Sequence, residues 1–149
     1  MTGSAGDNRY LGIYLNDHLA GAAGGVELAR RLRSSNGGEP EMGEPLARIC
    51  AEIEADRETL VRLTDRLGIR RDPVKPKLAI LAERLGRLKP NGHLRGYSPL
   101  SRVLELEILA SGIGGKLQLW NALEERFGDS LDGFDFHALS LLAGFWFGR

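Results

Sequence analysis

His18 and Asp56 are ionisable residues that lie within the apolar stripes of two consecutive predicted helices, residues 9–34 and 43–67. If these helices form an antiparallel hairpin, Asp56 lies about 4.5 Å along the axis from the position opposite His18. Such a pair could transfer a proton, or could bind a metal or small ligand together with a carboxylate such as Glu107. The preferred interpretation is a satisfied buried polar pair that fixes the register of the helices, because a buried charge requires a partner.

Other signatures of catalysis or metal binding are absent from the sequence. There is no Cys-x-x-Cys, His-Glu-x-x-His or Gly-x-Ser-x-Gly. The segment 112–116 resembles the end of a phosphate-binding loop, but the required first glycine and final Ser or Thr are replaced. Cys50 is the single cysteine and is expected to be an inert core thiol, which suits a reducing compartment. These observations favour a protein that is not an enzyme.

Positive charge is concentrated in the middle of the chain. Residues 66–102 hold half of the 20 Lys and Arg but only two acidic residues, Asp72 and Glu83. This basic segment could bind an anion or nucleic acid, or it could lie against the acidic faces of neighbouring helices. The internal explanation is preferred, since aromatic residues for base stacking are scarce there. The candidate anion-binding residues are Arg70, Arg71, Lys75, Lys77, Arg84, Arg87 and Arg95.

The elements that would position these residues are all helical. A helix is predicted over 98–127, a shorter one from about Asp135, and a further short one over about 76–88. No alternating strand pattern occurs, so the fold class is all-α. Two patches of small residues, 20–25 and 110–115, indicate either close helix packing, which is preferred, or a cavity for an apolar ligand.

The order helix, short turn, helix, long connection, helix, turn, helix resembles the ferritin-like four-helix bundle. The run from Ile53 to Leu67 is also similar to second helices of ferritin-like stress-associated proteins. The resemblance implies a bundle with a helical crossover over 69–97 and a short last helix. It would also imply a di-iron centre built from Glu-x-x-His motifs.

That di-iron motif is absent here. The positions three residues before His18, His93 and His137 hold Leu, Pro and Phe. An intact di-iron site is therefore not expected. We predict no cofactor, with iron or another divalent metal as the alternative.

The organisation of the whole chain follows from its length, charge and last helix. With 149 residues and zero formal net charge, the chain is expected to be one domain, 1–149, with a flexible N-terminus over 1–8. No apolar run is long enough to span a membrane, so a cytoplasmic protein is expected.

The last helix ends in three consecutive aromatic residues, Phe145, Trp146 and Phe147. They cannot all face one core, which predicts a homodimer. The preferred function is a structural or protein-interaction module.

Overall fold

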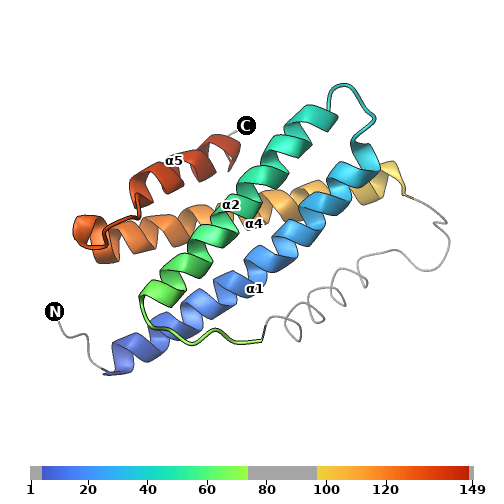
Figure 1. The fold of residues 1–149 in the computed structure, drawn as a ribbon. Coiled ribbons are helices and arrows are strands. Elements are labelled where there is room, and N and C mark those ends of the chain that lie inside the picture. The colour runs from blue at the N-terminus through green and yellow to red at the C-terminus, as the bar shows by residue number, and fades with distance from the viewer. Residues whose placement is uncertain (1–4, 74–96, 148–149) are drawn as a thin grey trace. The chain divides into compact units, whose positions relative to one another are not determined.

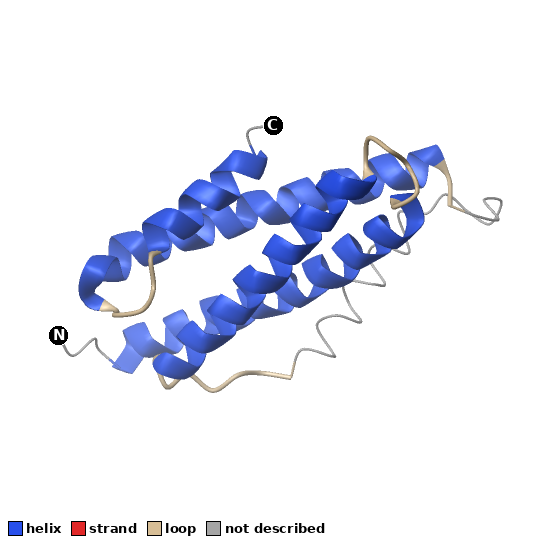
Figure 2. Cartoon of the chain, turned by 45° about the horizontal axis from the view of Figure 1, so that its top comes forward, coloured by secondary structure: helices blue, strands red, loops and turns tan. Residues whose placement is uncertain are grey.

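The computed structural model describes residues 5–73 and 97–147, and its regular elements are helices (Figure 1). They are α1 (Ala5–Asn36), α2 (Gly43–Arg66), α4 (Pro99–Phe127) and α5 (Phe136–Phe147), with a 3₁₀ turn over Gly128–Ser130. The described residues contain no strand, which confirms the all-α prediction (Figure 2). The predicted helix over 76–88 lies outside these residues.

Most of the predicted helix boundaries agree with the structure to within two residues. The main exception is the first helix, which begins at Ala5 and not at residue 9. Residues 5–8 were expected to belong to a flexible N-terminus, but they contain no proline and continue the helix backwards in spite of Gly6. The same helix runs two residues past the predicted end at 34.

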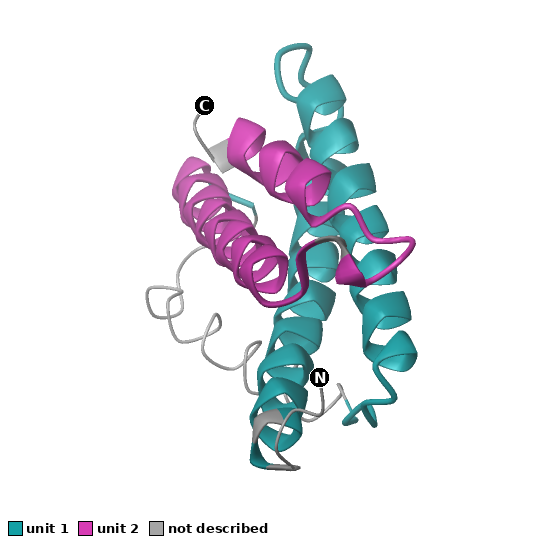
Figure 3. Ribbon diagram, turned by 90° about the vertical axis from the view of Figure 1, so that its left-hand side faces the viewer, with its two compact units in different colours: residues 1–98 teal, residues 99–149 magenta. Residues whose placement is uncertain are grey.

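The chain divides into two compact units, Met1–Ser98 and Pro99–Arg149, which Figure 3 shows in different colours. Within each unit, two helices pack against each other as a hairpin. The boundary falls where the third long helix was predicted to begin. That the units together make one domain stays a prediction.

In the first unit, α1 and α2 are joined by a tight turn and share an apolar core. Leu15 and Leu32 of α1 and Leu63 of α2 are fully buried. The turn depends on close backbone approach, because a methyl group on Gly43 would lie 2.6 Å from the carbonyl oxygen of Gly37. The predicted turn is therefore set by two glycines as well as by the apolar stripes.

The end of α2 redirects the chain back toward α1. Gly68 adopts a left-handed conformation with φ of 67°, and the amides of Gly68 and Ile69 donate to the carbonyls of Asp65 and Thr64. This is a Schellman arrangement, in which glycine takes the position past the helix end. It directs the Ile69 side chain toward α1, where a methyl group on Gly12 would meet Ile69 Cγ2 at 3.6 Å.

In the second unit, α4 and α5 pack around an aromatic cluster at the end where they are joined. Phe136 is buried, and its ring centroid lies 6.5 Å from Trp120, 6.4 Å from Phe127 and 6.1 Å from Phe134. The Asp135 carboxylate accepts a 2.8 Å hydrogen bond from the amide of Ala138 and so caps α5.

The two small-residue patches are only partly explained by close packing. In α1, a methyl group on Gly25 would contact Ile53 Cγ2 at 3.8 Å, as expected where two helices pack together, whereas one on Gly21 would meet nothing within 4 Å. In α4, methyl groups on Gly112 and Gly115 would meet no other atom within 4 Å, and both glycines are exposed. Close packing therefore does not explain these two glycines.

We predict that Gly115→Ala stabilises the protein by roughly 0.5–1 kcal/mol, because the helix loses an unfavourable glycine and the methyl group has space. The measurement is the free energy of unfolding from urea denaturation. The matched variant is Gly128→Ala, which places a side chain at a φ of 49° and should destabilise. A loss of stability in Gly115→Ala would contradict the open surroundings of that residue.

Candidate functional site

His18 is half-buried on α1, and two of its neighbours lie on the same helix. Its ring makes an edge-to-face contact with Tyr14, with 4.6 Å between ring centroids. Burial lowers the pKa of His18, and the Asp17 carboxylate offsets part of that effect. Burial thus favours the neutral imidazole, whereas the neighbouring carboxylate favours the charged form.

The register of the hairpin is close to the one predicted for His18 and Asp56. The approach of Gly25 to Ile53 places residue 18 opposite about residue 60 of α2, so Asp56 lies about four residues from that position. Gly12 also approaches Ile69, but Ile69 follows the end of α2 at Arg66 and does not report on the helical register. The pairing of His18 with Asp56 stays a prediction.

The candidate metal ligands are also separated along the chain. Asp56 is half-buried on α2, whereas Glu107 is exposed on α4, in the second unit. Among the residues that the structure describes, no three His, Cys, Asp or Glu side chains gather closely enough to hold a metal ion. The metal-binding alternative therefore has no set of ligands in the described part of the chain.

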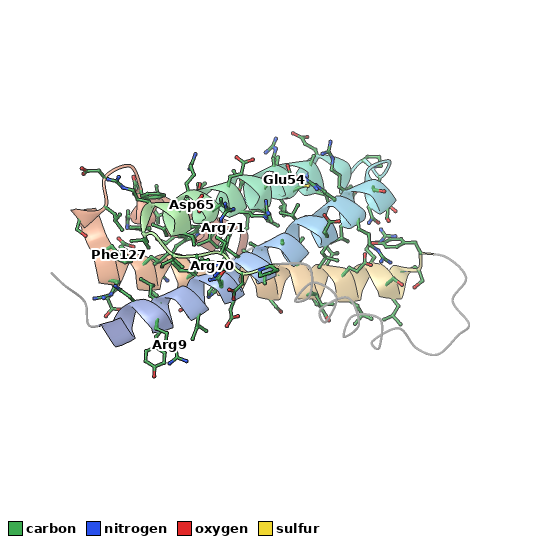
Figure 4. All side chains as sticks on the ribbon, turned by 60° about the horizontal axis from the view of Figure 1, so that its bottom comes forward. Arg9, Glu54, Asp65, Arg70, Arg71 and Phe127 are labelled. Carbon is green, nitrogen blue, oxygen red and sulfur yellow. The ribbon has the colours of Figure 1, made fainter. Side chains whose placement is uncertain are left out.

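Two of the candidate anion-binding residues follow the end of α2, as Figure 4 shows. Arg71 forms an ion pair with Asp65, with 3.0 Å between Nε and Oδ1. Arg70 is exposed, and its backbone carbonyl accepts a hydrogen bond from α1. The ion pair of Arg71 thus agrees with the internal explanation for the basic charge, because Asp65 lies on the neighbouring helix α2. Lys75, Lys77, Arg84, Arg87 and Arg95 lie outside the described residues.

Asn16 is a buried polar residue of α1 that the sequence interpretation missed. Its Nδ2 donates to the carbonyls of Gly12 at 2.9 Å and Arg70 at 3.0 Å, and its Oδ1 accepts from the amide of Asp72 at 2.7 Å. The side chain therefore fastens the chain that leaves α2 onto α1. The available signal was asparagine inside a predicted helix, where it is intrinsically unfavourable.

Asn36, at the end of α1, was also missed. Its Nδ2 donates to the carbonyl of Leu32 and to the hydroxyl of Tyr97, both at 2.9 Å. The last described part of the connection before α4 is thus held on α1 by a second asparagine. Asn36 lies beyond the predicted end of the first helix at residue 34.

The single cysteine lies beside a polar contact between α1 and α2. Arg30 Nε donates to Glu54 Oε1 at 2.7 Å, and the buried Cys50 thiol lies 3.8 Å from the same oxygen. Burial raises the pKa of Cys50, and the Glu54 carboxylate raises it further. The thiol remains protonated at neutral pH, which agrees with the inert core cysteine that was predicted.

The last helix carries an apolar surface in place of a polar one. We define the apolar face of α5 as Leu141, Leu142 and Phe145, which are 62%, 51% and 50% exposed. The opposite side of α5, which is buried, holds Phe136, Ser140 and Ala143. Phe145 thus lies outside the core, and the homodimer inferred from the terminal aromatic residues stays a prediction; Leu141 and Leu142 were not foreseen as exposed.

Comparison with known proteins gives no match to a protein-family model, to a curated protein or to a solved structure. None of the described helices has the length and apolar character needed to cross a bilayer.

We predict that Asn16→Ala lowers the free energy of unfolding by about 1–3 kcal/mol, because it removes the acceptor of the Asp72 amide and the donor to Arg70. Urea denaturation measures this loss. The control is Asn8→Ala, an exposed asparagine of the same helix. Equal stability of the two variants would show that the Asn16 contacts contribute nothing.

We also predict that His18→Gln flattens the pH dependence of stability. Burial lowers the pKa of folded His18 below its ordinary value of 6.5, so the unfolded chain binds the proton more readily. Stability of the parent protein should therefore fall as the pH decreases through 6.5 toward the folded pKa. Urea midpoints measured between about pH 5 and pH 8 test this. An unchanged slope in His18→Gln would contradict the assignment.

Proposed function

We propose that this protein is a structural or protein-interaction module, not an enzyme, and that it pairs with a second copy of itself through the apolar face of α5. The observation that carries the proposal is that small residues of this helix are buried while large apolar residues are exposed. Two of the three buried residues named above, Ser140 and Ala143, are small, whereas Leu141, Leu142 and Phe145 are large, apolar and half or more exposed. Such a face is typical of an interaction surface.

A second copy is a suitable partner for reasons of charge and shape. Helix α5 contains no Asp, Glu, Lys or Arg, so a twofold pairing of two such helices brings no like charges together. Leu141 and Phe145 are four residues apart and Leu142 and Phe145 three apart, so the three side chains form one continuous surface. The pairing would bury apolar area on both copies at once.

The expected strength of the pairing is moderate. Completing the burial of a half-exposed Leu or Phe contributes roughly 1 kcal/mol, so six such side chains contribute on the order of 6 kcal/mol. The entropy lost on association opposes this gain. We therefore expect a dimer whose population depends on protein concentration.

We further propose that the chain belongs to the ferritin-like class of helical bundles, without its di-iron centre, and that the protein is cytoplasmic. The support is the order of the helices, with two hairpins separated by a long connection. The buried, protonated Cys50 is compatible with a reducing compartment. The metal and anion alternatives are not favoured by any contact among the described residues.

The test is the molar mass by light scattering over a wide range of protein concentration. We expect the parent chain to approach twice 16.3 kDa as concentration rises. Leu142→Glu should remain near 16.3 kDa, because two-fold pairing would bring unpaired carboxylates into an apolar contact.

The matched control is Leu100→Glu, since Leu100 is also a half-exposed leucine but lies at the start of α4. This variant should associate as the parent does. A parent chain that remains monomeric at high concentration would refute the proposed pairing. Dissociation by both variants would show that the α5 face is not the specific contact.

A further inference from the structure

The outward side of α5 includes a small residue as well as large apolar ones. A methyl group on Gly144 would meet Leu117 Cδ1 of α4 at 4.0 Å, which marks the side of α5 that packs on α4. Ala138 lies away from that side and is half-buried. It precedes Leu142 by one helical turn and Phe145 by two, so the three residues share one side of the helix. The apolar face of α5 therefore continues to Ala138.

The sizes of the side chains along this face are complementary to themselves when the order is reversed. The face begins with the small Ala138, has Leu141 and Leu142 in the middle and ends with the large Phe145. In an antiparallel pairing about a twofold axis between residues 141 and 142, each Phe145 lies opposite Ala138 of the second copy. The leucines of both copies meet at the centre. Each aromatic ring then fills the space above an alanine, as a knob fills a hole between packed helices.

A parallel pairing would lack this complementarity. It would place the two Phe145 rings opposite each other and the two Ala138 side chains opposite each other, which separates the helices at one end and leaves a void at the other. The partial charges of the backbone favour the antiparallel choice as well. Helix α5 contains no Asp, Glu, Lys or Arg, so its own dipole acts within the contact, and antiparallel helices bring opposite partial charges together.

The small size of the face makes close packing necessary. A standard interface buries about 800 Å² on each partner. Three half-exposed side chains supply much less, since even a fully buried aromatic side chain contributes only about 150–250 Å². Close approach of the two helices at Ala138 brings the flanking residues of α5 into the contact.

We propose that the pairing through α5 is antiparallel, that Phe145 of each copy packs over Ala138 of the other, and that Ala138 is the residue that determines specificity. This inference rests on the pairing proposed above and adds its direction and register. An apolar helix with a large side chain opposite Phe145 is excluded, so the surface selects a second copy of this chain.

The test is the dissociation constant of the dimer, measured by sedimentation equilibrium on the full chain. Ala138→Leu adds apolar surface to α5 but occupies the space that Phe145 fills in the antiparallel pairing. We expect it to raise the dissociation constant at least about tenfold, because overpacking occurs at both symmetry-related positions. Unchanged or tighter association would overturn the proposal, since a general apolar contact or a parallel pairing gains from the larger side chain.

An exchange of the two side chains tests the register itself. Ala138→Phe alone should weaken the dimer as Ala138→Leu does, and the addition of Phe145→Ala should restore it by about tenfold, because each ring again lies opposite an alanine. Restoration also excludes misfolding as the cause of the first effect. Further weakening by Phe145→Ala, as expected for loss of apolar area alone, would contradict the register.

The matched control is Ala55→Leu, which adds the same side chain at an exposed alanine of α2 and should leave the dissociation constant unchanged. A parent chain that forms no dimer refutes the pairing and this inference together. A parent dimer that Ala138→Leu strengthens refutes only the antiparallel register.

Discussion

A buried side-chain amide must satisfy two nitrogen hydrogens and one oxygen, and in the first unit this requirement determines the path of the chain after α2. Asn16 satisfies all three with the Gly12 carbonyl, the Arg70 carbonyl and the Asp72 amide. The left-handed Gly68 makes these contacts possible, because it turns the chain toward α1 as soon as α2 ends. The path of residues 68–72 therefore depends on the packing of α1 against α2.

Much of the fold could be predicted from the sequence because apolar periodicity and breaker residues report directly on helices. The stripe through Leu15 and Leu32, and Gly68 after the second helix, led to the correct elements. The ends of the first helix were less accessible, since it begins at Ala5 and runs two residues past its predicted end at 34. The roles of Asn16 and Asn36 depend on partners more than fifty residues away in sequence, and no local pattern indicates such partners.

The candidate sites illustrate the same limit. A polar residue in an apolar stripe is compatible with a catalytic pair, a metal ligand or a local contact, and only the surroundings distinguish these. For His18 the neighbours include Tyr14 and Asp17 of the same helix. In α5 the composition indicated an apolar helix, but which residues are exposed depends on how the helix packs on α4. The placement of Ala143 inward and Leu142 outward is what gives the helix a second surface to bury.

Asn16 fixes the start of the connection on α1 through its contacts with Arg70 and Asp72. Hydrogen exchange at the backbone amide of Asp72, which lies beyond the end of α2, tests this role most directly because Asn16 Oδ1 accepts a hydrogen bond from that amide. We expect this amide to exchange as slowly as amides within the hairpin helices. Exchange at the rate of an unstructured peptide would show that the buried asparagine does not hold the chain there.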